Sequence, residues 1–452
     1  MSDKIYIAHH RESDGEQQFL EEHLIGVSTL AKNFAKKIGL ETQGELIGLL
    51  HDLGKYSKAF QDYLKSAVGL INPDEDDYVD AQGLKGKVDH STAGAQAIWH
   101  ELSKKGVEGQ IVGQILALCI ASHHSGLIDC LSSDFNNSAK DKFTERMNKP
   151  ENKAHLQEVF SKMNGAISQR FQQIMDDPNI VKDLMGGLKN LANPKNHNET
   201  IFKFKTGLLV RFLFSCLIDA DRLNTADFEK PIAAQKRLNG RYVDFDTLIN
   251  HLEKRLSEFK SDSDVNKLRC QISDHCRESA YRKQGIFTLS VPTGGGKTLG
   301  SLRFALHHAK KYELERIIYV IPFTSIIDQN ADETRKILEP KDIPESCGNV
   351  VLEHRSNLMP EEQTWKDKIL TENWDAPIIY TTSVQFLDTL FSGGTRGARR
   401  MHQLAKAVII FDEIQTIPLN CVHIFNNAIR ASLKIPHHLT AILVSSNGVE
   451  MR

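Results

Sequence analysis

The strongest constraint on the fold is a short segment in the second half of the chain. The apolar run Ile286–Val291 leads directly into Pro292-Thr-Gly-Gly-Gly-Lys-Thr298, which is followed by the helical pattern of Leu299–Ala309. A strand that passes through a glycine-rich loop into a helix is typical of a P-loop, whose backbone N–H groups surround phosphates at the helix N-terminus. Because this unit belongs to parallel α/β sheets, the sequence predicts such a sheet here.

Short β-rich runs continue beyond this loop and alternate with helical patterns. They lie at Ile317–Ile321, Ile378–Thr381, Ala407–Phe411 and Thr440–Val444. In the first part of the chain, apolar residues instead recur at helical spacing, in Phe19–Ile38, Leu46–Leu53, Ala93–Leu102, Ile111–Ile120 and Phe202–Leu223. We therefore expect a multi-domain protein: an all-α helical bundle (residues 1–230), a charged helical connector (231–283), and an α/β RecA-like P-loop domain with a parallel sheet (284–452).

The P-loop predicts a site for ATP with Mg²⁺. The residues expected to contact the nucleotide are Thr293, Gly294, Gly295, Gly296, Lys297 and Thr298. In such loops the lysine binds the β- and γ-phosphates and the hydroxyl binds Mg²⁺. Val291 stands where the strict pattern has Gly or Ala.

A second motif completes the expected nucleotide site. Asp412-Glu-Ile-Gln415 follows the apolar run Val408–Phe411. We expect Asp412 to be a partner of the Mg²⁺ ion and Glu413 to orient the attacking water.

Composition narrows the class of protein. The 452 residues are 40% hydrophobic and 25% charged, as in ordinary globular proteins. The net charge of −2 implies that any nucleic-acid surface is a local patch. The N-terminus lacks the apolar stretch of a signal peptide. Seven scattered cysteines without a CxxC pair argue against a disulfide framework or a structural zinc, and they predict a reducing cytoplasm.

The helical part carries an ordered set of histidines and aspartates. The adjacent pair His51-Asp52 lies at the end of an apolar helix that is expected to stop at Gly54. The other members of the set are His23, His90, the adjacent pair His123-His124, and an aspartate in Leu217-Ile-Asp-Ala-Asp-Arg-Leu223. In this last segment Asp219 and Asp221 compete for the final position.

Imidazole and carboxylate ligands together suit Mn, Fe, Co, Ni or Zn rather than Mg or Ca. Seven ligands are enough for two metal ions that share a bridging carboxylate, and such a pair can hydrolyse a phosphodiester. Lys55 is placed to neutralise a phosphate oxygen. The alternative is that these histidines only pack between helices. The remaining histidines considered are interpreted as surface or packing residues: His9, His10, His100 and His155.

Two strand-to-helix junctions lie between the nucleotide motifs. Ile321-Pro-Phe-Thr-Ser-Ile326 and Thr381-Thr-Ser-Val-Gln-Phe386 have backbone amides and hydroxyls that could hold the phosphates of a nucleic-acid strand. The arginines 396, 399 and 400 in a glycine-rich loop are interpreted either as part of this grip or as a solvated loop.

Taken in this order, the motifs resemble those of the CRISPR-associated nuclease–helicase of type I interference systems. The resemblance rests on the histidine–aspartate set, on Pro292-Thr-Gly-Gly-Gly-Lys-Thr298, and on Asp412-Glu-Ile-Gln415. It implies an HD-type nuclease domain that acts on single-stranded DNA, joined to a superfamily 2 helicase. It also implies recruitment by a crRNA-guided surveillance complex. The metal ligands that it implies, for two transition-metal ions such as Fe, Mn, Co or Ni, are His23, His51, Asp52, His90, His123, His124 and Asp221. Among these, His51 and Asp52, with Lys55, carry the expected catalysis.

The sequence departs from this family at Leu443-Val-Ser-Ser-Asn447, shortly before Arg452. The family has a Ser/Thr-Ala-Thr motif there and a second RecA-like domain after it. Our expectation is a truncated or split form that hydrolyses ATP poorly, with the second motor domain supplied by a separate chain.

Two other functions remain compatible with the sequence. One is an HD phosphohydrolase that acts on nucleotides, although such an enzyme has no use for strand-gripping motifs. The other is a non-catalytic module that binds DNA or the surveillance complex.

Overall fold

The computed structural model describes residues 5–69, 88–133, 139–192, 198–260, 262–339, 350–354, 373–417, 419–434 and 440–445. Ser446 and Asn447 of the last sequence motif lie outside this part. The chain forms two compact units, of which the first comprises Met1–Gln235 and Gly393–His402. The second comprises Lys236–Ser392 and Gln403–Arg452.

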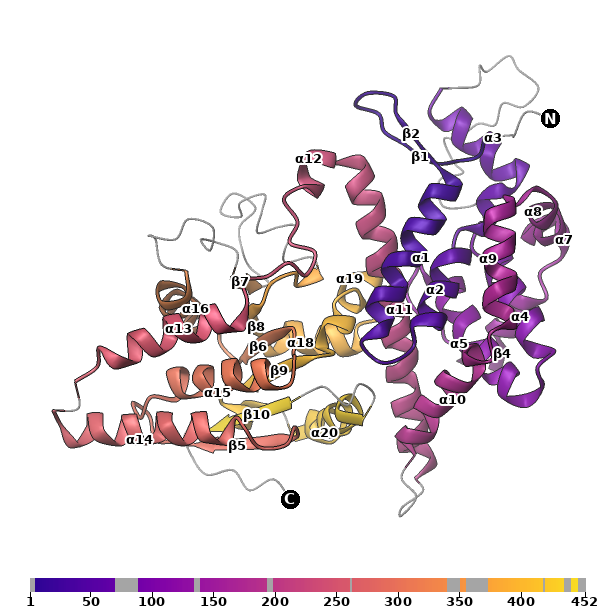
Figure 1. Cartoon of the computed structure of the whole chain (residues 1–452). Coiled ribbons are helices and arrows are strands. Elements are labelled where there is room, and N and C mark those ends of the chain that lie inside the picture. Colours follow the sequence, from indigo (N-terminus) through magenta and orange to yellow (C-terminus); the bar gives the residue numbers. More distant parts are fainter. Residues whose placement is uncertain are drawn as a thin grey trace. The chain divides into compact units, whose positions relative to one another are not determined.

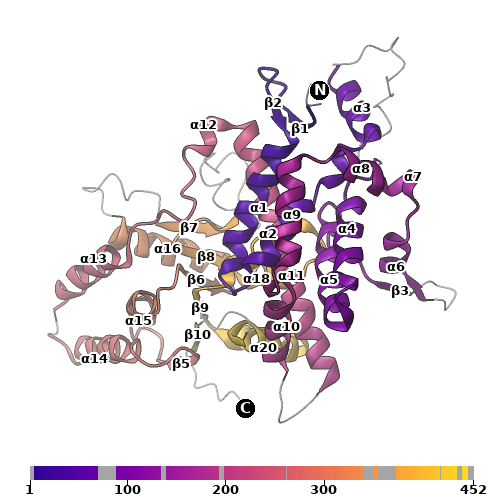
Figure 2. The same cartoon turned by 45° about the vertical axis from the view of Figure 1, so that its right-hand side comes forward.

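The first unit is helical and carries two short antiparallel hairpins (Figure 2). Its elements are β1 (Ile7–His10), β2 (Gln17–Phe19), α1 (Leu20–Lys36), α2 (Glu41–Leu50), η1 (Leu53–Tyr56), α3 (Lys58–Ala67), α4 (Thr92–Ser103), α5 (Gly106–Ser122), β3 (Leu131–Ser133), β4 (Ala139–Asp141), α6 (Lys142–Met147), α7 (Glu151–Ala154), α8 (Leu156–Lys162), α9 (Gly165–Asp176), α10 (Asn179–Leu191), α11 (Glu199–Glu229), α12 (Pro231–Ala234) and α19 (Thr395–Ala398).

Close helix packing explains why the sequence forms this unit. Helix α1 buries Leu20, Leu24, Val27 and other residues at helical spacing against α2. The backbones approach closely because a Cβ on Gly48 of α2 would lie 2.7 Å from the Cα of Ser28. Helix α11 is buried along the whole of residues 208–220, which makes it the central helix of the unit.

The second unit is built on a six-stranded sheet in the order β5-β10-β9-β6-β8-β7, with every neighbouring pair parallel (Figure 1). Its elements are α13 (Phe245–Ser257), α14 (Asp264–Ser279), β5 (Ile286–Ser290), α15 (Lys297–Lys311), β6 (Arg316–Ile321), α16 (Thr324–Leu338), β7 (Val351–His354), β8 (Ile378–Thr382), α18 (Ser383–Phe391), β9 (Ala407–Phe411), η3 (Ile414–Thr416), α20 (Leu419–Lys434) and β10 (Thr440–Ser445). The 3₁₀ helix η2 (Met401–Leu404) lies where the chain passes from the first unit back into the second, between His402 and Gln403.

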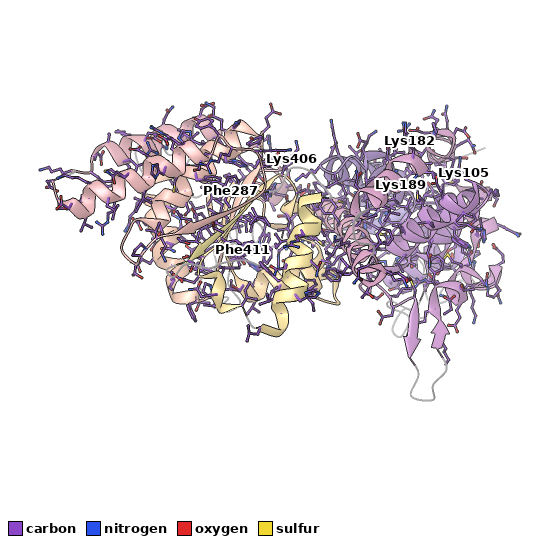
Figure 3. The ribbon with its side chains drawn as sticks, turned by 90° about the horizontal axis from the view of Figure 1, so that it is seen from below. Lys105, Lys182, Lys189, Phe287, Lys406 and Phe411 are labelled. Carbon is purple, nitrogen blue, oxygen red and sulfur yellow. The ribbon has the colours of Figure 1, made fainter. Side chains whose placement is uncertain are left out.

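The predicted fold class, a helical bundle followed by a parallel α/β domain, is confirmed. Strands form at all five predicted places, and β7 is an additional one. Four strands (β6, β8, β9 and β10) are buried along their whole length, as continuous apolar runs in a parallel sheet require. Figure 3 shows Phe287 of β5 and Phe411 of β9 in this unit.

The charged segment 231–283 was expected as a connector, but from Lys236 onward it is part of the second unit. Helices α13 and α14 both contact α15, the helix that follows the P-loop. Arg303 of α15 joins all three, because its guanidinium donates to Glu253 at 2.6 and 2.7 Å and to Asp274 at 2.8 Å. Among the described residues, no helix combines the length and the hydropathy that crossing a bilayer requires.

Two helical glycines test this packing. A Cβ on Gly94 of α4 would overlap the carbonyl oxygen of Leu50, whereas a Cβ on Gly186 of α10 would meet open space. We expect Gly94→Ala to destabilise the first unit by about 1–3 kcal/mol through overpacking. Gly186→Ala should stabilise it by about 0.5–1 kcal/mol, since alanine favours a helix interior. Urea unfolding followed by circular dichroism measures both, and equal stability of the two variants would contradict this account of the α2–α4 contact.

Candidate metal centre and nucleotide site

The histidines and aspartates singled out in the sequence come together in the first unit. They form two groups whose ligand atoms lie within 4.8 Å of one another, and both groups contain Asp52. The first group is Asp52, His90, His123 and His124, and the second is His23, His51, Asp52 and Asp221. All seven predicted ligands are therefore included, although only His23 of α1 and Asp221 of α11 lie within helices and the others lie just after α2, before α4 and after α5.

The pair at the centre lies just after a helix rather than within one. Helix α2 ends at Leu50, His51 is its C-cap, and Asp52 has turned away from helical geometry. Gly54 was expected as a helix stop, but its φ angle is not positive. Its role is close approach, because its N–H donates to the carbonyl of His90 at 3.0 Å and a Cβ would overlap the backbone of His90. This contact brings together ligands from the two groups.

Four of the histidines are oriented in the same way. In each ring Nδ1 is hydrogen-bonded to an oxygen: His23 to Asn224, His51 to Gly48, His90 to Val88 and His123 to Ile120, over 2.7–3.0 Å. Because these oxygens accept, Nδ1 carries a proton, and Nε2 is the nitrogen that faces the other ligands. Metal-binding histidines are commonly held by such a hydrogen bond on the other ring nitrogen.

The carboxylate of Asp52 divides its two oxygens between the groups. Oδ1 lies 3.2 Å from Nε2 of His123 and 3.6 Å from Nε2 of His90. Oδ2 lies 3.4 Å from Nε2 of both His23 and His51. Oδ1 of Asp221 closes the second group at 3.5–3.6 Å from the same two histidine nitrogens. Asp52 thus has the position of a bridging ligand.

The electrostatics are those of a cation site. Burial raises the pKa of Asp52, but Lys55 and His51 outweigh it and hold this pKa well below its usual value. Burial lowers the pKa of His90 to about 4 and that of His124 to about 3, so both rings are neutral at pH 7. At His51 the carboxylates of Asp52 and Asp221 outweigh burial and raise the pKa to about 10. The same two carboxylates would favour a metal ion in place of that proton.

Two buried atoms also indicate a cation site. Within the described part of the chain, Oδ1 of Asp52 and Nε2 of His123 form no hydrogen bond, although they lie 3.2 Å apart. Nε2 of His90 and Nε2 of His124 are 2.5 Å apart. Since buried polar groups are costly without partners, this donor set fits metal ions as the missing partners. Nitrogen and carboxylate ligands favour transition metals.

Lys55 contacts the central carboxylate of Asp52 directly. Its side chain is 5% exposed, and Nζ contacts Oδ2 of Asp52 at 2.8 Å and donates to the carbonyl of Ala8 at 3.2 Å. Lys55 therefore balances the central carboxylate. His9, interpreted from sequence as a surface or packing residue, is also near the centre, since its ring packs edge-on against His23 at 4.8 Å.

The structure distinguishes the two aspartates of α11. Asp219 is fully buried and binds Arg399 at 2.5 Å and His402 at 2.9 Å, away from the seven-residue set. Burial raises the pKa of Asp219, but Arg399 and His402 outweigh it and lower this pKa to about 2. The geometry thus favours Asp221 as the ligand.

Sequence reasoning missed the residues that orient His23. Oδ1 of Asn224 accepts from Nδ1 of His23 at 2.8 Å and from Nε2 of Gln18 at 2.9 Å. A signal for Asn224 was present, because it lies three residues after Asp221 and so on the same face of α11. Gln18, in the β1–β2 hairpin, had no such signal.

The P-loop of the second unit has the expected local geometry. Gly294 and Gly296 have φ angles of 80° and 85°, which glycine adopts readily. A Cβ on Gly295 would overlap the side chain of Val291, which is itself buried. Thr293 lies before these glycines, and α15 begins at Lys297, followed by Thr298. On the neighbouring helix α14, Nε of Arg269 donates to the carbonyl of Gly294 at 2.8 Å.

Asp412 and Glu413 follow β9 in this same unit. Nζ of Lys297 donates to Oε1 of Glu413 at 2.6 Å, which joins the two nucleotide motifs. Glu413 has a left-handed backbone with φ 48°, an unfavourable conformation for this residue that is common at functional sites. Burial raises the pKa of Asp412, and Lys297 opposes that shift.

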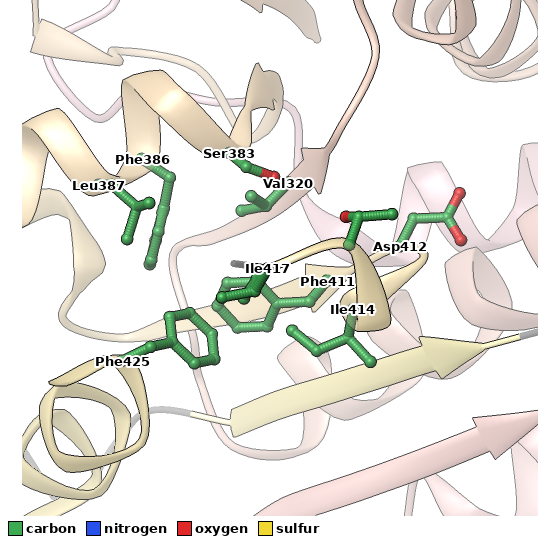
Figure 4. A pocket seen from close by; sticks show the side chains of 10 residues that line it. Val320, Ser383, Phe386, Leu387, Phe411, Asp412, Ile414, Ile417 and Phe425 are labelled. Atoms are coloured by element: carbon green, nitrogen blue, oxygen red, sulfur yellow. The ribbon is translucent and has the colours of Figure 1, made fainter. Parts of the chain in front are cut away.

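An apolar pocket lies beside Asp412. Figure 4 shows Phe386, Phe411 and Phe425 around it, and their rings meet edge to face at 5.2 and 5.0 Å. Ser383, at the start of α18, also lines the pocket. This helix and α16 both begin at carboxyl ends of neighbouring strands, as predicted for the two junctions.

The arginine cluster differs from both interpretations made from sequence. Arg399 and Arg400 are 4% and 3% exposed, whereas Arg396 is exposed. For Arg399 and Arg400 the burial excludes both a solvated loop and an open surface for DNA, whereas the exposure of Arg396 is compatible with either. Its glycine-rich context concealed the burial, because the buried partner Asp219 is distant in sequence.

The family models decide the relationship to known proteins. Residues 21–193 match the model of the Cas3 HD domain, and residues 271–446 match that of the DEAD/DEAH box helicases. The chain therefore resembles Cas3 nuclease–helicases in two successive domains. A putative CRISPR-associated nuclease/helicase Cas3 from Methanocaldococcus jannaschii is 21% identical over 381 residues, which cover 81% of this chain and 49% of that protein.

Solved Cas3 structures share the fold. The ATP complex of T. fusca Cas3 has a TM-score of 0.57 at 16% identity and covers 97% of this chain and 50% of its own. The ADP complex has a TM-score of 0.59 at 15% identity, with 98% and 50% covered. The chain thus spans about half the length of the relatives that it matches.

Asn224 allows a test of the metal centre without removing a ligand. We expect Asn224→Ala to weaken Mn²⁺ binding by about 10–100-fold, because His23 loses the hydrogen bond that fixes its ring. Isothermal titration with Mn²⁺ measures this change. Asn190→Ala, at an exposed helical position of the same unit, is the control. Unchanged Mn²⁺ affinity in a folded Asn224 variant would contradict the role given to this residue.

Proposed function

We propose that this chain is a metal-dependent nuclease that cleaves single-stranded DNA, linked to an ATP-binding helicase module, and that it acts in CRISPR interference. The observation that carries the proposal is the position of Asp52 between two ligand groups. Two transition-metal ions at such a centre, when bound, activate water and stabilise the attacking and leaving oxygens of a phosphodiester. Fe, Mn, Co and Ni suit the donor set.

The residues around the centre have separate roles in charge balance, in excluding water and in admitting the substrate. Asp52 and His51 define the centre from its buried side, and Lys55 keeps the shared carboxylate ionised. His23 and His123 have fully buried side chains, which exclude water from that side. The open side is marked by His124, which is exposed, and by Asp221 and His90, which are 18% and 15% exposed. A DNA strand approaches from there.

The second unit supplies the proposed ATP site. Residues 293–298 would hold the phosphates with Mg²⁺, and Asp412 would bind this ion. Lys297 must leave Glu413 to reach a phosphate, which frees that carboxylate to orient water. The N-termini of α16 and α18 lie at the carboxyl ends of the neighbouring strands β6 and β8, and the positive end of a helix favours contact with DNA phosphates.

The family relationship supports the proposed setting. We infer that a crRNA-guided surveillance complex delivers the DNA strand in the cytoplasm. A nucleotide phosphohydrolase remains an outcome of the experiment below rather than a second proposal, because the helicase fold favours a nucleic-acid substrate.

Cleavage of circular single-stranded DNA tests the nuclease. We expect the purified chain to nick the circle without ATP in Mn²⁺, Co²⁺ or Ni²⁺, and EDTA to stop the reaction. Asp52→Ala should lower the rate at least 100-fold, because both ligand groups lose their shared member. His100→Ala removes an exposed histidine of α4 and is the matched control. Hydrolysis of nucleotides but not of the circle would instead identify a nucleotide phosphohydrolase.

The ATP site has a separate test. Lys297→Ala should abolish binding of a fluorescent ATP analogue, because the phosphates lose their cationic partner. Glu413→Gln should retain binding or tighten it, since the ion pair that competes for Lys297 is removed. Asp52→Ala should bind the analogue normally. Equal binding by the wild type and Lys297→Ala would contradict the assignment.

A further inference from the structure

One segment of the helicase sequence belongs to the nuclease unit. Gly393–His402 lies in sequence between α18 and β9, which are both parts of the second unit, yet it is a member of the first. The chain therefore enters the helical unit a second time. We call this stretch, Gly393–His402, the return segment.

The return segment binds one face of α11 through buried polar contacts. Nε of Arg399 donates to Oδ1 of Asp219 at 2.5 Å, and Nε2 of His402 lies 2.9 Å from Oδ2 of the same carboxylate. Oγ of Ser215 donates to the carbonyl of Arg399 at 3.1 Å and accepts from the N–H of His402 at 2.9 Å. Arg222 donates to Oγ1 of Thr395.

The environment of these contacts is dry. The side chains of Asp219 and His402 are completely buried, and that of Arg399 is 5% exposed. The His402 ring also stacks on Phe34 of α1, with ring centroids 4.4 Å apart. Contacts between charges are strong and directional under such conditions, so they fix the position of α11 closely.

Helix geometry links this face to the metal centre. Ser215, Asp219 and Arg222 are spaced by four and three residues, so they share one face of α11. Asp221 and Asn224 share another, which faces His23 and His51. At about 100° per residue these two faces lie on opposite sides of the helix. Asp221 therefore projects from a helix that the return segment holds from behind.

We propose that the return segment couples the nucleotide site to the metal centre by setting the position of α11 and hence of Asp221. The covalent path is short, since β9 (Ala407–Phe411) follows the return segment and ends directly at Asp412. A displacement of β9 on nucleotide binding is transmitted to Asp219 and Arg222. Arg399 and His402 are positioning residues in this scheme, which rests on the proposed metal centre.

The test compares variants of the return segment in the full chain. Thr395→Val removes one hydrogen bond without burying a charge, and Arg399→Ala removes the main contact to Asp219. Arg399→Lys keeps the charge and should restore part of the effect. Arg170→Ala is the matched control, because it breaks an ion pair to buried Glu45 in the same unit that involves no residue of α11.

Two measurements are made with and without AMP-PNP and Mg²⁺. The first is Mn²⁺ affinity, which should fall at least tenfold in Arg399→Ala and two- to fivefold in Thr395→Val, but not in Arg170→Ala. The second is hydrogen exchange of the α11 amides from Ser215 to Asn224. In the wild type AMP-PNP should change their exchange at least twofold, and in Thr395→Val and Arg399→Ala this response should be lost although AMP-PNP still binds.

The two readouts separate this proposal from the proposed function. If the wild type binds no Mn²⁺, the metal centre is contradicted, and the exchange of α11 still decides whether the nucleotide site acts on this helix. An AMP-PNP response that is equal in the wild type and in folded Thr395→Val and Arg399→Ala would overturn the coupling. A response absent from the wild type would overturn it as well, and the return segment would then only stabilise the fold.

Discussion

The candidate metal centre depends on one buried carboxylate that is surrounded by several nitrogen-bearing partners. Asp52 is 2% exposed, and five nitrogen-bearing side chains from separate elements approach its two oxygens. A buried charge of this kind is costly unless it is compensated, so the surrounding helices must be placed accurately. The close backbone contacts at Gly48, Gly54 and Gly94 serve this requirement, because each brings another helix or loop to the segment that carries His51 and Asp52.

The fold was largely predictable from the sequence, for a physical reason. Parallel strands buried on both faces, such as β9, are continuous apolar runs. The edge strand β5 is partly exposed, but the P-loop motif that follows it requires a strand at this place. Strand β7 escaped notice because Val351–His354 is short and contains a charged residue. The end of α2 was placed too late because Leu53 continues the apolar pattern although the chain has already turned.

The seven histidines and aspartates of the candidate site were also found in the sequence, since their residue types and order carry the signal. Their surroundings were not. Gln18 and His9 come from a hairpin with no chemical motif, and the partnership of Asp219 with Arg399 joins residues 180 positions apart. No local pattern records such a pairing. The sequence left Asp219 and Asp221 as competitors because both are acidic residues of one helix, and only the side of the helix that each occupies distinguishes them.

The discontinuity of the first unit also has a consequence for its synthesis. The helices up to Gln235 leave the ribosome long before Gly393–His402 does, because all of residues 236–392 must be translated in between. At typical bacterial and eukaryotic translation rates this interval lasts roughly 10–30 s. Throughout it, Asp219 lacks Arg399, so the nascent helical unit remains incomplete. Completion of the candidate metal centre is thereby delayed until most of the P-loop domain has been made.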